Sequence, residues 1–270
     1  MPHLKKSDCE NNFSVQYNLQ PHGLGATRAN LLKLLRSLDL VSWSTHEESG
    51  RLDRKAFTRF AVGSTAIFSK RQVAEAETSA VSILVDCSGS MQDYGRIVVA
   101  ESLTIQLARL LDKARVEFTI NGFSGRGGYK SVEAGGANGA HSQDIRVERV
   151  DYLAFKTWKE NLAKASAKLG GMAKCAGGST PDYSGIRIKL EELALRDESR
   201  KIMFLLTDAD GYDSNHMKHL QAFADKQNIK IIAIGIGRTN VKACFTVSDD
   251  VQNVHDLASA SFNKLLKELA

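Results

Sequence analysis

The sequence contains only three prolines and no apolar run long enough to cross a membrane. Scarce proline predicts long regular elements, because proline interrupts both helices and sheets. A membrane-spanning helix needs about 20 consecutive apolar residues, so none is expected. The first residues, MPHLKKSDCENNF, also lack the apolar core of a signal peptide. We therefore expect a soluble cytoplasmic protein.

The few cysteines do not form a recognisable motif. Cys9, Cys87, Cys175 and Cys244 lie far apart, and no two of them form a CxxC pair. This spacing excludes the common zinc and thioredoxin-like cysteine motifs. Scattered thiols in a chain of this length are typical of reduced cysteines in the cytoplasm.

The charge is nearly balanced, with 36 Lys and Arg against 31 Asp and Glu, giving a formal net charge of +5. The excess is spread along the chain, whereas nucleic-acid binding proteins usually concentrate basic residues on one face. We therefore expect no nucleic-acid partner. A hydrophobic content of 43% with 25% charged residues is typical of a globular protein.

From residue 80 onward, apolar runs typical of strands alternate with segments of helical periodicity. The predicted strands are Ala80–Asp86, Arg115–Phe123, Ile145–Val150, Lys201–Asp208, Ile229–Ile236 and Phe245–Val247. The predicted helices are Gly95–Lys113, Thr157–Lys168, Pro181–Leu195, Asn215–Lys226 and Val254–Leu269. This order predicts an α/β fold. We expect a three-layer αβα sandwich, in which a doubly wound, mainly parallel sheet has one antiparallel edge strand.

Residues 1–79 lack this alternation and are predicted to form an N-terminal extension to an α/β domain over residues 80–270. The extension contains one predicted helix, Ala26–Arg36, and hairpin-like alternation over Leu40–Phe68. Within the α/β domain, the glycine-rich segment Gly122–Asp144 is predicted to be a long mobile loop, since ordering glycine is costly in backbone entropy.

Polar residues follow several strands of the predicted sheet at the edge where ligands bind in doubly wound folds. Asp86, Ser88 and Ser90 follow the first strand, Thr180 precedes a proline-opened helix, and Asp208 ends the strand Lys201–Asp208. Oxygen ligands of this kind suit a hard cation. We expect Mg²⁺, with Mn²⁺ and Ca²⁺ as alternatives. Two carboxylates balance a divalent ion and leave a coordination position open for a carboxylate from outside.

This set of residues resembles the metal-ion-dependent adhesion site of von Willebrand factor A (VWA) domains. That family combines D-x-S-x-S with a threonine loop and an aspartate after a buried strand, and all five positions match here. The resemblance implies a Rossmann-like VWA fold and Mg²⁺-dependent protein binding.

A narrower resemblance is to the VWA region of the cobaltochelatase T subunit (CobT-like). It rests on the stretches LVDCSGSM, KIMFLLTDAD, IKIIAIGIGRTNV and GRLDRKAFTRFAVG. The resemblance implies a role in cobalamin biosynthesis or a related remodelling complex. The chain would be the non-ATPase partner of a MoxR- or CobS-type AAA+ ATPase ring, whose carboxylate completes the metal site.

Other readings of the same residues are weaker. A haloacid-dehalogenase phosphatase needs a second acid where Ser88 stands, and an EF-hand needs glycine and glutamate where Asp213 and His219 stand. Spaced three apart, His216 and His219 are read as exposed helix residues rather than metal ligands. No catalytic residue is assigned. Two alternatives stay open: a metal-dependent hydrolase, and an adhesion-type binding module without an ATPase partner.

Overall fold

The structure is a computed structural model. It describes residues 5–19, 25–27, 29–30, 41–47, 49–52, 68–73, 78–134, 141–237, 239–253 and 255–256. The predicted helix Val254–Leu269, apart from His255 and Asp256, and most of the predicted helix Ala26–Arg36 lie outside these residues. In the part of the chain that the structure describes, no helix combines the length and apolarity needed to cross a membrane.

The core of the protein is a six-stranded sheet with the strand order β6-β5-β4-β7-β8-β9. Neighbouring strands are parallel except for β6, which pairs antiparallel with β5 at the edge. The strands are β4 (Ser79–Asp86), β5 (Glu117–Ala134), β6 (His141–Lys156), β7 (Arg200–Thr207), β8 (Ile229–Ile236) and β9 (Ser248–Val251). The predicted mainly parallel sheet with one antiparallel edge strand is therefore confirmed.

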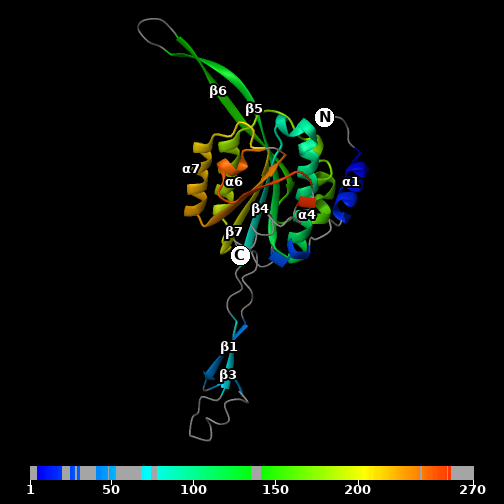
Figure 1. Cartoon of the computed structure of the whole chain (residues 1–270), viewed down its shortest axis with the longest axis vertical. Coiled ribbons are helices and arrows are strands. Elements are labelled where there is room, and N and C mark those ends of the chain that lie inside the picture. The colour runs from blue at the N-terminus through cyan, green and yellow to red at the C-terminus, as the bar shows by residue number, and fades with distance from the viewer. Residues whose placement is uncertain are drawn as a thin grey trace.

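Helices cover both faces of this sheet (Figure 1). One face carries α1 (Lys6–Asn18), α4 (Arg96–Ala114), α5 (Leu162–Leu169) and the short turn η3 (Met172–Lys174). The other carries α6 (Asp182–Ala194), α7 (Ser214–Lys226) and α8 (Val241–Cys244). Every residue of β4 is buried, and its side chains alternate between the two cores: Val81, Ile83 and Val85 lie in the first, Leu84 in the second. The apolar run thus makes β4 the central strand, and the three-layer sandwich is confirmed.

The prediction of a long loop over Gly122–Asp144 is wrong for residues 122–134 and 141–144, and residues 135–140 lie outside the described part of the chain. Strands β5 and β6 continue as an antiparallel ribbon, paired from Ile120 opposite Lys156 to Ala134 opposite His141. Figure 1 shows this ribbon extending beyond the body of the sheet. Backbone pairing between strands that are close in sequence accommodates the glycines without needing their side chains, which is why composition was misleading. The predicted edge strand Ile145–Val150 is the middle of β6, and the predicted strand Phe245–Val247 is displaced, since the observed strand β9 begins at the next residue, Ser248.

The N-terminal segment contains a helix and a small sheet, which lie apart in the sequence. A small antiparallel sheet has the order β1-β3-β2, formed by β1 (Val41–Glu47), β2 (Arg51–Leu52) and β3 (Phe68–Val73). Of the range Leu40–Phe68, for which hairpin-like alternation was predicted, the structure describes residues 41–47, 49–52 and 68. Helix α1, which the sequence did not reveal, packs on α4 and α5 through buried Cys9 and Phe13.

A buried carboxylate fixes α1 to the domain. Glu101 of α4 accepts hydrogen bonds from the Asn12 side chain (2.7 Å) and from the Ala173 backbone N–H (2.8 Å). Asn12 also donates to the carbonyl of Gly170 (2.8 Å). Burial raises the pKa of Glu101, against the lowering effect of these donors. Three segments distant in sequence therefore meet at one side chain.

Glu101→Ala is expected to lower the free energy of unfolding by about 2–4 kcal/mol, because it leaves the Ala173 N–H and the Asn12 amide without their acceptor. Limited proteolysis should then cut α1 before the rest of the domain. The matched control is Glu191→Ala, which removes only an exposed pair with Arg187 and should cost less than about 0.5 kcal/mol in chemical denaturation. Equal losses in the two variants would contradict this assignment.

Candidate metal centre

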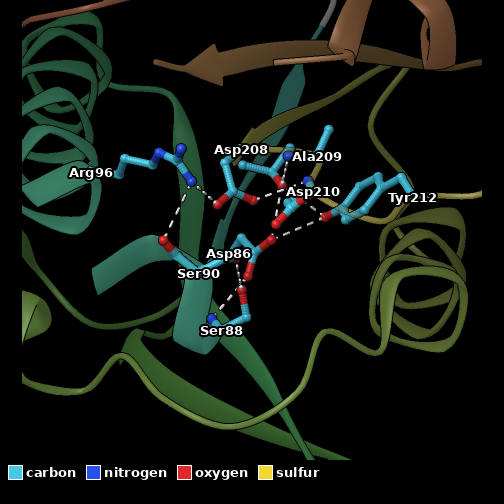
Figure 2. A network of polar contacts seen from close by, with 9 residues as sticks. Asp86, Ser88, Ser90, Arg96, Asp208, Ala209, Asp210 and Tyr212 are labelled. Carbon is cyan, nitrogen blue, oxygen red and sulfur yellow. Dashed lines mark hydrogen bonds and ion pairs between the residues drawn. The ribbon is translucent and has the colours of Figure 1, made fainter. Parts of the chain in front are cut away.

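The first part of the site is the turn that follows β4. Asp86 is the last residue of the strand and is completely buried, as is Ser88. The Ser88 N–H donates to Oδ1 of Asp86 (2.9 Å), and the hydroxyls of Ser88 and Ser90 lie 3.1 Å apart. Figure 2 shows the carboxylate and both serines gathered at this turn. The extended spacing read in D-x-S-x-S therefore places three oxygen donors together.

The second oxygen of Asp86 is held from the next strand. Thr207, at the end of β7, donates its hydroxyl to Asp86 Oδ2 (2.8 Å), and the Tyr212 hydroxyl donates to the same atom (3.3 Å). Sequence reasoning missed both residues. Thr207 directly precedes a predicted ligand at a strand end, so its position was a usable signal, whereas Tyr212 lies in a loop whose path the sequence does not fix.

Burial disfavours the charged form of the Asp86 carboxyl group. Burial, together with the smaller effect of the negative charge of Asp208, raises the pKa of Asp86 to about 6, although hydrogen bonds from Ser88 and Thr207 lower it. The hydrogen-bond donors around Asp86 therefore do not offset the burial of its negative charge beside the second carboxylate, Asp208. A cation bound between the two carboxylates would supply the missing positive charge.

Asp208 follows β7 and is also engaged on both oxygens. Its Oδ1 accepts the Asp210 N–H (3.1 Å), and its Oδ2 accepts Nη1 of Arg96 (2.8 Å) from the first turn of α4. The Asp208 side chain is 1% exposed and that of Arg96 19%. The sequence did not single out Arg96, although a basic residue soon after D-x-S-x-S was visible.

The loop that leads from Gly177 to Thr180 is held by backbone hydrogen bonds to the turn after β4 and to β5. Gly177 N–H donates to the Cys87 carbonyl (2.8 Å), and Gly89 N–H donates to the Gly178 carbonyl (3.0 Å). Gly125 of β5 exchanges two backbone hydrogen bonds with Ser179, at 2.7 and 2.8 Å. These contacts fix the backbone just before Thr180 beside the serine turn. Pro181 then precedes α6, close to its predicted start.

Other polar candidates have structural roles. Asp213 caps α7 by accepting the N–H groups of Asn215 and His216, and His216 and His219 are exposed on that helix. Cys87 is buried, and burial raises the pKa of its thiol, which does not favour a nucleophile.

The donor chemistry at the rim fits a hard cation. It consists of two carboxylates and serine hydroxyls, with a threonine loop held beside them, and oxygen donors of this kind suit Mg²⁺, Mn²⁺ or Ca²⁺. Among the described residues, no group of three or more His, Cys, Asp and Glu side chains is placed to hold a metal ion. A metal at this rim would therefore need the hydroxyls as ligands.

Comparisons with known proteins match most of the chain. Residues 67–269 match the family described as the cobalamin biosynthesis protein CobT VWA domain. No curated protein matches the chain.

Solved structures that are similar to the chain have low sequence identity to it. A von Willebrand factor type A protein from Catenulispora acidiphila is 15% identical, with a TM-score of 0.45, over 74% of this chain and 44% of that chain. Manganese-loaded TRAP protein from Plasmodium vivax is 13% identical, with a TM-score of 0.47, over 72% and 73%. Proximal thread matrix protein 1 from the mussel byssus, with a zinc-occupied MIDAS motif, is 16% identical, with a TM-score of 0.47, over 72% and 46%.

Proposed function

Because the chain belongs to the family of CobT VWA domains, we propose that it is a protein-binding subunit whose docking requires a divalent cation. The observation that carries the proposal is the convergence of Asp86, Ser88, Ser90 and Asp208 at the carboxyl ends of β4 and β7. Asp208 is paired there with Arg96, whereas buried Asp86 is held by hydrogen bonds from Ser88, Thr207 and Tyr212, which carry no positive charge.

The residues that would hold the ion are Asp86, Ser88, Ser90, Thr180 and Asp208. We propose Mg²⁺ as the ion in the cell, with Mn²⁺ and Ca²⁺ as competent substitutes. When bound, the ion supplies a Lewis-acidic position for a carboxylate from another protein. The chain contributes the rest: β4 and β7 fix the two aspartates, and Thr207 and Tyr212 orient the Asp86 carboxylate.

The family suggests what the partner is. We propose a AAA+ ATPase ring of the MoxR or CobS type, with a ring Asp or Glu as the incoming carboxylate. In this arrangement ATP hydrolysis belongs to the ring, and the VWA subunit transmits the ring's action to a client in a cobaltochelatase-like or remodelling complex. The free cysteines of the described residues are compatible with work in the cytoplasm.

The test is a pull-down of a purified MoxR-type AAA+ ATPase from the same organism in Mg²⁺ and in EDTA. Wild type should retain the ring only in Mg²⁺, and Ser88→Ala/Ser90→Ala should retain it in neither condition, because two proposed ligands are gone. Ser214→Ala, at the exposed start of α7, is the control and should bind like wild type. Equal capture by all three proteins in EDTA would place the contact elsewhere and overturn metal-dependent docking.

A further inference from the structure

Arg96 already occupies part of the proposed metal site. Its Nη1 donates to Asp208 Oδ2 at 2.8 Å and lies 3.4 Å from the carbonyl oxygen of Ser90 (Figure 2). One guanidinium therefore contacts two of the proposed ligand residues. Its side chain is mostly buried, so solvent screens the ion pair only weakly.

Charge counting shows what this contact does. Asp86 and Asp208 together carry two negative charges when ionised, and Arg96 supplies one positive charge. A divalent ion at the same carboxylates would turn this net negative site into a net positive one if Arg96 stayed in place. Like charges at this distance repel strongly in a poorly solvated site, so the ion and the guanidinium compete for Asp208.

The structure has open space beside Asp208 into which the Arg96 side chain can move. Two cavities flank the guanidinium. One, of about 270 Å³, is lined by Asp208, Asp210 and Asn240, among others. The other, of about 540 Å³, is lined by Tyr94, Ile236 and Gln252, among others. Arg96 borders both, and the Tyr94 ring lies 5.6 Å from its guanidinium carbon, an arrangement that attracts a cation.

We infer that Arg96 is a resident cation that competes with the divalent ion for Asp208 and so sets the metal affinity of the site. Without metal, Arg96 neutralises Asp208 and stabilises the folded protein. When a divalent ion binds, the guanidinium leaves Asp208 and turns towards Tyr94, whose own side chain is 96% exposed. The inference rests on the proposed function, because it assigns a role to Arg96 in the proposed metal site.

The test measures Mn²⁺ binding to the full chain by isothermal titration calorimetry and melting temperature in EDTA and in saturating Mn²⁺. Arg96→Gln should bind Mn²⁺ at least tenfold more tightly than wild type. It should melt lower than wild type in EDTA, yet at the same temperature or higher in Mn²⁺. Arg96→Lys keeps a charge without the planar fork and should fall between the two. Arg187→Gln removes an exposed ion pair on α6, in which the arginine lies 2.7 Å from Glu191, and should leave Mn²⁺ affinity unchanged.

The outcomes separate this inference from the proposed function. A residue with only a structural role would lower the melting temperature in both conditions without tightening Mn²⁺ binding. Wild-type binding of Mn²⁺ with equal or weaker binding by Arg96→Gln and Arg96→Lys would overturn the resident cation and leave the metal site standing. Absence of Mn²⁺ binding by wild type and by both variants would overturn the metal site as well. Binding by Arg96→Gln alone would support the competition in its strongest form.

Discussion

Replacing Asp86 by asparagine is expected to stabilise the metal-free protein by about 1–3 kcal/mol, because it removes a charge that burial disfavours. Asparagine keeps the oxygen that accepts the Ser88 N–H. In the wild-type protein the hydroxyls of Thr207 and Tyr212 donate to the Asp86 carboxylate. In the variant the asparagine amide can donate to these hydroxyls instead. The same change removes a proposed ligand and half of the site's negative charge. The rise in melting temperature that Mg²⁺ gives wild type should therefore disappear.

The stabilisation should depend on pH with a defined sign. The pKa of Asp86 is raised from 3.8 to about 6 in the folded protein. The stability that a raised pKa contributes is full below pH 3.8 and is lost as the pH rises through about 6. In EDTA, the advantage of Asp86→Asn over wild type should be small near pH 4 and reach its full size above pH 6.

Thermal melts in EDTA and in Mg²⁺ across this pH range check both statements. Asp210→Asn is the control, since Asp210 lies at the same rim but is exposed, and it should change stability by less than about 0.5 kcal/mol. An Asp86→Asn protein that keeps the full Mg²⁺ shift would exclude Asp86 as a ligand. One that melts below wild type in EDTA at neutral pH would show that the carboxylate charge stabilises the fold.

The fold could be read from the sequence because its determinants are local. Within the predicted strand Lys201–Asp208, residues 202–206 are all apolar, which is typical of a strand covered on both faces, and β7 lies within one residue of that prediction. The sequence did not predict the ribbon of β5 and β6, because backbone pairing between strands has little effect on hydrophobic periodicity. Helix α1 was not predicted for a related reason: much of its contact with the domain is polar, through Asn12 and Glu101.

For the candidate site, the sequence predicted the ligand positions but not the partners of each ligand. The order of Asp86, Thr180 and Asp208 along the chain, each at a predicted strand or helix end, was enough to expect them at one rim. What the sequence could not supply is which partners each carboxylate has. Arg96 is 112 residues from Asp208 along the chain, and only the packing of α4 beside β4 and β7 brings them together. The partners matter, because they set how readily the site exchanges its own cation for a metal.

Gly178→Ala is expected to cause the largest loss of metal binding of any change outside the ligands. Gly178 has a φ of +86°, and a Cβ there would lie 2.3 Å from the carbonyl oxygen of Gly125. That contact is too short for any side chain, so the loop must move away from β5. The movement would break the paired hydrogen bonds between Gly125 and Ser179 and withdraw Thr180 from the rim.

The matched control is Gly211→Ala, which imposes the same kind of backbone cost. Gly211 has a φ of +72°, and its added Cβ would meet nothing within 4 Å, so the variant should lose about 1–2 kcal/mol of stability and keep its metal affinity. Gly178→Ala should lose about 3 kcal/mol or more, because the clash and the lost loop hydrogen bonds add to that backbone cost. Calorimetry should show Mn²⁺ bound at least tenfold more weakly, in a domain whose far-ultraviolet circular dichroism is unchanged. If Gly178→Ala bound Mn²⁺ as tightly as Gly211→Ala, the clamped loop would not be delivering a ligand, and Thr180 would have to be removed from the proposed set.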